Sequence, residues 1–465
     1  TAEGTADEPV GFTTSEARGG AGQWGGIKVE GNRFSSATFK HVTVEYGNYG
    51  IYVNMPRNNE GFVLSVEDSA ITNNSAYGIR VARTDDNWDG YAGSVKVKDT
   101  LIKNNGQGIH ANYDRAYVEI ENCDILGNTE HGVYMRRNVK QIIKNSLISG
   151  NGYGIEVHEN EGRQETQREV IGNIVENNKY YGIRIYYFSV DTSLGRTEKI
   201  SDNVIKSNGG SGLEMQSEHY ANLEVSNNEI VDNRGIGFYL SHVRGDLIFE
   251  KNKINNNNGY GARVEQAERD IQFTFNSIIE NVGFGVSIRK EYWRGDSSKN
   301  IIINGNTVQS TKLSGDGNGP MDEEHTGIYL YYKSTANVEF SGNKVENFQG
   351  YGVNIENNSS LSSLSFENNT GKENKKTGLK VYGRILPAIE GNTLDKNGRG
   401  IEINYTDANA AGEFEISANA IRNSSEYGVR IEGNAKPSIT GNDLDGNGDH
   451  AVENKTSNEI NAKNN

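Results

Sequence analysis

The repeating unit of this chain is clearest at residues 118–135, which read VEIENCDILGNTEHGVYM. Within it, residues 118–120, 123–125 and 133–135 alternate apolar and outward positions, and turn residues such as Asn128 separate them. Alternation with a period of two residues predicts short β-strands, and no stretch of the chain shows a helical period. The unit therefore predicts three short strands joined by three turns.

This unit recurs along the whole chain, marked by a glycine before an apolar–x–apolar triplet. The shortest spacings are 22 to 25 residues, which is the range of solenoid repeats. The glycine anchors are Gly26, Gly50, Gly78, Gly108, Gly132, Gly154, Gly182, Gly212, Gly237, Gly261, Gly285, Gly327, Gly352, Gly378, Gly400 and Gly428. We predict an all-β fold, a right-handed parallel β-helix solenoid of about 17 coils of three short strands.

Two columns of asparagine accompany the anchors. The first contains Asn173, Asn203, Asn228, Asn252, Asn276, Asn306, Asn343, Asn369, Asn392, Asn419 and Asn442, with Ser69, Thr100, Cys123 and Ser146 at its early positions. The second contains Asn74, Asn105, Asn128, Asn151, Asn178, Asn208, Asn233, Asn257, Asn281, Asn397 and Asn447. Asparagine tolerates left-handed backbone geometry, and its amide can bond to the coils on either side. We therefore predict buried asparagine ladders at two turns.

Composition and charge agree with an ordered chain that has a thin core. Hydrophobic residues make up only 34% of its 465 residues, yet 24 Tyr and 14 Phe argue against disorder. The net charge is -15 and no long basic stripe is present, which argues against nucleic acid as a partner. No run of 18 apolar residues occurs, so no membrane span is expected. The single cysteine, Cys123, excludes an internal disulfide.

The motif N-x-I-x-x-N-x-x-Y-G-I-x-I resembles that of parallel β-helix repeat proteins. These are the pectate-lyase-like superfamily and its carbohydrate-binding and sugar-hydrolysis (CASH) domains. The stretch Trp24-Gly25-Gly26-Ile27 is also similar to the start of many secreted or surface β-helix proteins. The resemblance covers essentially the whole chain and implies this fold, but it matches no specific enzyme family.

We expect residues 1–465 to form a single β-helix domain. Insertions are expected near residues 83–93, 159–168, 187–197 and 291–326, where the spacing between anchors is longer. Neither end reads as an amphipathic capping helix, although a solenoid needs caps over its open core. The expectation is therefore a fragment of a longer chain, or one that stacks with neighbouring domains or subunits.

The strands after the anchors carry the candidate site, because the insertions follow them and alternation points every second side chain outward. By this register His158 lies between Arg136 and Tyr186, and Glu156 between Tyr134 and Arg184. Tyrosine rings stack on sugars, and arginine forks hold carboxylates or sulfates. The candidate substrate-binding residues are Arg136, Arg184, Tyr186, His110, Tyr239 and Arg263, and the candidate catalytic residues are His158, Glu156, Tyr134 and Glu214.

Two classes of function remain open. One is a secreted or cell-surface protein that binds, and in one version cleaves, a polysaccharide or cell-surface glycan. The other is a structural rod or adhesin segment of a larger surface protein or filament without catalytic activity. In this second class, the outward residues form ion pairs and cross-strand aromatic ladders that stabilise an exposed sheet.

Two enzymatic schemes fit the outward residues. In a polysaccharide lyase, Arg136 or Arg184 neutralises a uronate, His158 removes the C5 proton, and Tyr134 or Tyr186 acts as the acid. In an inverting glycoside hydrolase, Glu156 and Glu214 are the carboxylate pair, two coils or roughly 9.6 Å apart.

No cofactor is predicted. For a metal, Asp85, Asp86 and Asp89 could hold Ca²⁺ through oxygen ligands, but no clear calcium motif is present, and a solvated acidic loop is the simpler interpretation. Localisation is expected to be extracellular or at the cell surface.

Overall fold

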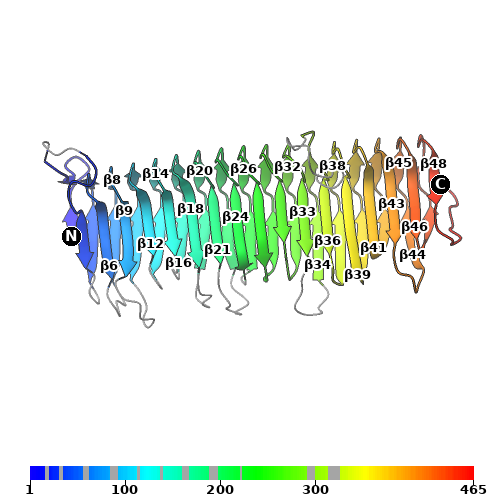
Figure 1. Ribbon diagram of the computed structural model, residues 1–465, viewed down its shortest axis with the longest axis horizontal. Coiled ribbons are helices and arrows are strands. Elements are labelled where there is room, and N and C mark those ends of the chain that lie inside the picture. The colour runs from blue at the N-terminus through cyan, green and yellow to red at the C-terminus, as the bar shows by residue number, and fades with distance from the viewer. Residues whose placement is uncertain are drawn as a thin grey trace. The chain divides into compact units, whose positions relative to one another are not determined.

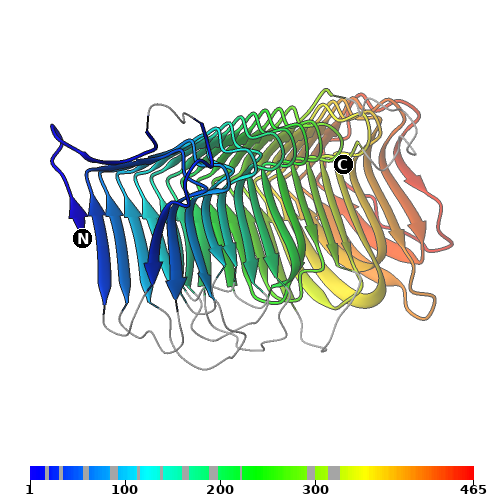
Figure 2. The same cartoon turned by 60° about the vertical axis from the view of Figure 1, so that its left-hand side comes forward.

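The computed structural model describes residues 1–15, 20–30, 35–55, 62–83, 93–112, 116–136, 140–159, 167–187, 197–219, 222–290, 299–312 and 325–465. The chain divides into two units, Thr1–Arg234 and Gly235–Asn465. In each unit the described elements are β-strands, arranged in three parallel rows. We call them the anchor row, which follows the glycine anchors, the middle row and the short row. Figures 1 and 2 show the strands of each row side by side.

In unit 1, each strand pairs with its equivalent in the next coil. The anchor row contains β3 (Ile27–Glu30), β6 (Tyr49–Met55), β9 (Tyr77–Arg83), β12 (Gln107–Asn112), β15 (His131–Arg136), β18 (Tyr153–Glu159), β21 (Ile183–Tyr187) and β24 (Leu213–His219). The middle row contains β1 (Ala2–Glu3), β4 (Ser36–Lys40), β7 (Val63–Glu67), β10 (Ser94–Lys98), β13 (Tyr117–Glu121), β16 (Lys140–Lys144), β19 (Gln167–Ile171), β22 (Thr197–Ser201) and β25 (Asn222–Ser226). The short row contains β2 (Val10–Phe12), β5 (Val42–Glu45), β8 (Ala70–Thr72), β11 (Leu101–Lys103), β14 (Asp124–Leu126), β17 (Leu147–Ser149), β20 (Ile174–Glu176), β23 (Val204–Lys206) and β26 (Glu229–Val231).

Unit 2 repeats this arrangement. Its anchor row contains β27 (Phe238–Val243), β30 (Ala262–Glu265), β33 (Val286–Lys290), β36 (Ile328–Tyr332), β43 (Arg399–Tyr405), β46 (Tyr427–Gly433) and β48 (His450–Asn454). Its middle row contains β28 (Leu247–Glu250), β31 (Ile271–Thr274), β34 (Lys299–Asn304), β37 (Ala336–Ser341), β44 (Gly412–Ser417) and β47 (Ala435–Thr440), while β39 (Val353–Glu367) and β41 (Thr377–Glu390) run through both rows. Its short row contains β29 (Lys253–Asn255), β32 (Ser277–Ile279), β35 (Thr307–Gln309), β38 (Lys344–Glu346), β40 (Thr370–Lys372), β42 (Thr393–Asp395) and β45 (Ala420–Arg422).

The fold is the predicted all-β right-handed parallel β-helix. Within the described residues the short row contains 16 strands, so the number of coils differs only slightly from the predicted value of about 17. After β48 the described chain forms an isolated bridge between Asn461 and Ser438.

Alternation sends the aliphatic side chains of each strand inward. In β13, Val118 and Ile120 are fully buried while Glu119 between them is not. The anchors must be glycine because adjacent coils approach too closely for a side chain. A Cβ atom on Gly108 would lie 2.3 Å from the carbonyl oxygen of Gly132 in the next coil. The thin core is therefore closed by backbone contact at one turn of every coil.

Both asparagine columns form buried ladders, as predicted. Asn203 Oδ1 accepts from the backbone N–H and from Nδ2 of Asn173, each at 3.0 Å. Its own Nδ2 donates to the carbonyl of Val170 at 2.7 Å and to Oδ1 of Asn228 at 2.9 Å. Each amide thus satisfies backbone groups that the turn leaves without partners.

The left-handed residue is not the ladder asparagine itself but the residue before it. Asp68, Asp99 and Asn122 have φ of 47°, 47° and 53°, and each precedes a ladder position. The prediction of left-handed geometry for the ladder residue itself was wrong, because that residue turns its side chain inward.

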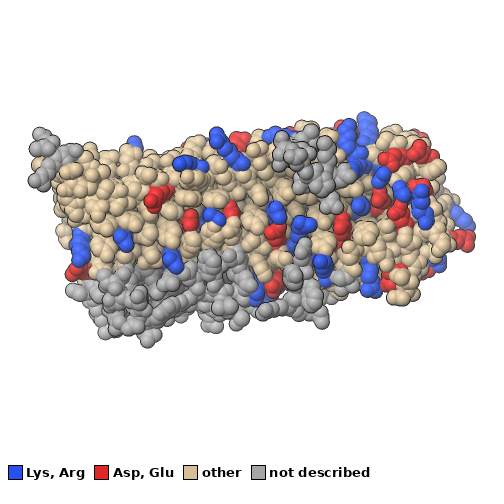
Figure 3. Space-filling view, in the orientation of Figure 1, with Lys and Arg blue, Asp and Glu red and all other residues tan. Residues whose placement is uncertain are grey.

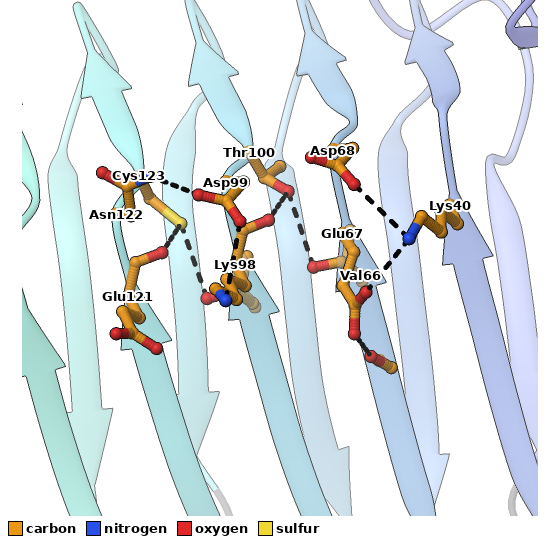
Figure 4. Close-up of polar contacts among 12 residues, drawn as sticks. Lys40, Val66, Glu67, Asp68, Lys98, Asp99, Thr100, Glu121, Asn122 and Cys123 are labelled. Carbon is orange, nitrogen blue, oxygen red and sulfur yellow. Dashed lines mark hydrogen bonds and ion pairs between the residues drawn. The ribbon is translucent and has the colours of Figure 1, made fainter. Parts of the chain in front are cut away.

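Figure 4 shows the early positions of the first column, where smaller donors replace asparagine. Thr100 Oγ1 donates to the carbonyl of Lys98 at 2.7 Å. The Cys123 thiol makes the equivalent contact with the carbonyl of Glu121 at 3.2 Å, and burial raises its pKa to about 12. Cys123 is therefore a protonated ladder residue, as its position in the column predicts.

Two predicted insertions include residues that belong to regular coils. Residues 299–309 contain β34 and β35, since Ile301, Ile303 and Val308 point inward and Asn306 continues the first ladder. Residues 167 and 168 begin β19, and Arg168 is buried. The remaining parts of the predicted insertions lie outside the described residues: 84–92, 160–166, 188–196, 291–298 and 313–324. Asp85, Asp86 and Asp89, the candidate calcium ligands, are among them.

Candidate functional site

The outward side chains of the anchor row in unit 1 form two columns. In the first, the registers align Tyr52, Arg80, His110, Tyr134, Glu156, Arg184 and Glu214 on successive strands. In the second they align Asn112, Arg136, His158, Tyr186 and Gln216. His158 thus lies between Arg136 and Tyr186, and Glu156 between Tyr134 and Arg184.

Six aromatic or imidazole rings on this face form a continuous series of contacts, which we call the ring strip. Its members are Tyr49, Tyr77, His110, Tyr134, His158 and Tyr186, from β6, β9, β12, β15, β18 and β21. Successive ring centroids are 5.7, 5.0, 4.7, 5.4 and 4.7 Å apart. On the face of unit 1 that carries these strands, Figure 3 shows only scattered charged atoms among other residues.

Sequence reasoning missed the residues that precede the glycine anchors. Tyr49, Tyr77, His131, Tyr153 and Tyr181 occupy this position, whereas the candidates chosen from the sequence all follow the anchors. The glycine and the following isoleucine or valine are both buried, as at Gly132 and Val133, so the residue before them is partly exposed. The tyrosine in the Y-G-I motif was the available signal.

Glu156 is held by two histidines. Its Oε2 lies 3.2 Å from His131 Nε2, and its Oε1 lies 2.5 Å from His158 Nε2. Burial favours the neutral carboxyl, but the two imidazole hydrogen bonds outweigh it and lower the pKa of Glu156 to about 2. Glu156 is therefore ionised at neutral pH and accepts a hydrogen bond from Nε2 of each imidazole.

Glu214 has the opposite electrostatic character. Burial raises its pKa, and the charge of Glu156 adds to this, while Arg184 and hydrogen bonds from Gln216 and Ser211 oppose it. Arg184 Nη2 lies 3.7 Å from Glu214 Oε1. The Arg184 guanidinium also lies over two rings, 4.3 Å from the centroid of Tyr181 and 4.1 Å from that of Tyr186. The row thus aligns an ionised carboxylate, an arginine and a carboxyl group with a raised pKa.

His110 and Tyr134 stack in the middle of the ring strip. Burial and the charges of Arg80 and His131 lower the pKa of His110 to about 4. Burial raises the pKa of Tyr134, against a hydrogen bond and charge from Arg136. At neutral pH both rings are therefore uncharged.

Tyr239 and Arg263, the two candidates in unit 2, face each other on β27 and β30. Arg263 Nε donates to Glu265 Oε1 at 2.8 Å, and the Tyr239 hydroxyl donates to Glu265 Oε2 at 3.2 Å. The guanidinium already has a carboxylate partner, unlike an arginine that awaits an anionic ligand.

Across the described ranges, no three His, Cys, Asp or Glu side chains gather where they could hold a metal ion. Within the same ranges, no helix is long and apolar enough to span a membrane.

The stacked parallel coils, glycine anchors and ladders define a parallel β-helix protein. The sequence matches the family described as the right-handed β-helix region over residues 25–198, 189–321, 321–385 and 361–465. The chain belongs to that family. No curated protein matches it.

Solved structures with a similar arrangement are enzymes by their names. They include a mannuronan C-5 epimerase A-module from Azotobacter vinelandii, with 12% identity, 88% of this chain and 90% of that chain covered, and a TM-score of 0.30. A periplasmic alginate epimerase has 12% identity, with 89% of this chain and 77% of that chain covered and a TM-score of 0.27. A DFA-IIIase from Arthrobacter chlorophenolicus has 12% identity, with 87% of this chain and 83% of that chain covered and a TM-score of 0.24. At such TM-scores their activities carry no weight for this chain.

Proposed function

We propose that unit 1 binds a polysaccharide along its ring strip. The observation that carries this proposal is the unbroken series of rings from Tyr49 to Tyr186, one on each of six successive anchor strands. A surface needed only for folding could use threonine and lysine at these positions. Partly exposed rings instead offer apolar faces for sugar rings, with hydroxyl and imidazole groups beside them.

The direction of the strip also suits a polymer. Neighbouring strands of a row are about 4.8 Å apart, so six strands place rings along about 24 Å. A linear chain lying across the strands can therefore contact several rings at once. Arg136 and Arg184 flank the strip and supply planar donors for sugar hydroxyls or acidic groups. Tyr239 and Arg263 in unit 2 remain a separate prediction.

We place this function outside the cell or at its surface, where such polymers occur. In the alternative, the protein is a rod or adhesin segment and the ring strip only stabilises the sheet. That alternative has support in the structure, because the same rings contact one another. Binding measurements separate the two.

A second candidate function is hydrolysis of the bound polymer. It is favoured by the opposite pKa shifts of Glu156 and Glu214 in the first column, since an inverting hydrolase needs an ionised base and a protonated acid. Glu156 would activate water and Glu214 would protonate the leaving oxygen. The lyase scheme uses the other column, with His158 as the base, Tyr134 or Tyr186 as the acid and Arg136 or Arg184 on the uronate.

The test is a glycan array followed by titration calorimetry on the best ligand. Tyr134→Ala and Tyr186→Ala should each weaken binding about tenfold, which corresponds to about 1.4 kcal/mol. Tyr382→Ala is the matched control, because it removes an outward tyrosine from β41 in unit 2 and should leave affinity unchanged. If no glycan binds, or if all three variants bind like the parent, the rod interpretation replaces this proposal.

A further inference from the structure

Arg80 lies beside the start of the ring strip, in contact with three tyrosine rings. Its guanidinium carbon lies 4.8 Å from the ring centroid of Tyr77, 5.6 Å from that of Tyr52 and 5.8 Å from that of Tyr49. The only hydrogen bond to it within the described part of the chain is a long one, 3.5 Å to the Tyr49 hydroxyl. We call Arg80 and these three tyrosines the Arg80 cluster.

The charge of Arg80 is not neutralised by any residue that the structure describes. Its register neighbours are Tyr52 and His110, and His110 is uncharged at neutral pH because its pKa is lowered to about 4. Two of the other arginines on anchor rows have carboxylates beside them. Arg184 has Glu214 at 3.7 Å, and Arg430 has Glu432 at 2.5 Å.

The packing of Arg80 leaves its donors available. Cation–π contacts use the flat faces of a guanidinium, whereas its N–H groups point outward in the plane of the group. Nε of Arg80 is buried without a partner in the described residues, so the Nη groups are the donors that a ligand can reach. A planar anion that approaches the edge of the guanidinium could accept two parallel hydrogen bonds, the geometry that arginine forms with carboxylates.

We propose that the Arg80 cluster is a subsite for an acidic sugar, in which Arg80 binds the carboxylate or sulfate group and the tyrosines contact the sugar ring. This inference rests on the proposed polysaccharide binding and adds a preference for an acidic sugar unit at the Arg80 cluster. Arg80 distinguishes an acidic unit from a neutral one at this end of the ring strip. About three strand spacings, or about 14 Å, separate it from Glu156 along the first column.

The experiment compares polymers that differ only in charge. The probes are polygalacturonate and its carboxyl-reduced form, and dextran sulfate and dextran, titrated by calorimetry into the full chain at low and high salt. The parent should prefer the acidic member of at least one pair by tenfold or more. The preferred pair identifies the anion as carboxylate or sulfate.

The variants are Arg80→Gln, Arg80→Lys and the control Arg430→Gln, which removes an arginine that already has carboxylate partners. Arg80→Gln should lose that preference and keep the affinity for the neutral polymer within twofold. Arg80→Lys keeps the charge without the fork and should recover part of the preference. Arg430→Gln should match the parent. Thermal unfolding of each variant checks that the fold is retained.

Three outcomes overturn the inference. Equal affinity of the parent for both members of each pair removes the acidic subsite and leaves polysaccharide binding intact. An acid preference that survives in both Arg80 variants assigns the anion to another residue. Failure of the parent to bind any of the four polymers and any glycan on the array overturns the proposed function and this inference with it.

Discussion

Arg168 Nη1 donates to Glu198 Oε2 at 2.6 Å inside unit 1, and neither side chain is exposed to solvent. Arg168 Nε also donates to Gln141 Oε1 at 2.8 Å. A charged pair therefore replaces the aliphatic residues that occupy most inward positions of the middle row. Removing charges from water is costly, and the cost is offset only while both partners are present.

Removal of one partner should destabilise the protein strongly. We expect Glu198→Ala to lower the free energy of unfolding by about 3–5 kcal/mol, because it leaves a buried guanidinium without its counter-charge. Chemical denaturation followed by circular dichroism measures this. The double variant Arg168→Met with Glu198→Leu should regain most of the loss. Glu224→Gln, in a partly exposed ion pair with Lys199, should cost no more than about 0.5 kcal/mol. A cost for Glu198→Ala as small as that of this control would contradict the prediction.

The ladders predict a second stability effect. Asn203→Ala leaves the backbone N–H of Asn173 and the carbonyl of Val170 without their amide partner, and should cost about 1–3 kcal/mol. The measurement is the same denaturation experiment, with Lys103→Ala on the exposed face of the short row as the control. Indistinguishable losses in the two variants would show that the amide contributes no net stability.

His110 should make stability depend on pH. Its folded pKa of about 4 lies below the ordinary value near 6.5, so the unfolded chain takes up the proton first as pH falls. The stabilisation is complete above about pH 6.5 and is lost as pH falls through about 4. Between pH 7 and pH 4 the parent should lose about 1–3 kcal/mol more than His110→Gln. Identical pH profiles of unfolding free energy would refute this.

Because the fold is a solenoid, the order of outward residues along the anchor row could be predicted from the sequence. Once the anchors set the period, the neighbours of any outward residue are the residues at the same offset in adjacent coils. This is why the order Arg136, His158, Tyr186 could be written down in advance and agrees with the registers.

The repeat period does not predict where side chains lie within one coil. The bend at the anchor turns His131 outward, and only the resulting side-chain positions bring its imidazole to Glu156. Arg168 was assigned to an insertion from the anchor spacing alone, and its partner Glu198 lies 30 residues further along the chain. Side-chain pairs of this kind depend on rotamers and burial, which repeat spacing does not encode.

The final prediction concerns catalysis by the hydrolytic scheme. Glu214→Gln and Glu156→Gln should each lower the release of reducing ends from the bound polymer by at least about 10²-fold while affinity is retained. The scheme requires Glu156 ionised and Glu214 protonated. Since the pKa of Glu156 is about 2 and that of Glu214 is raised by burial, hydrolysis should be fastest in acid and should fall as pH rises through the pKa of Glu214. Glu402→Gln, on the anchor row of unit 2, is the control and should retain the parent rate. Unsaturated products that depend on His158 would instead support the lyase scheme, and full hydrolytic activity in Glu214→Gln would exclude this carboxyl group as the acid.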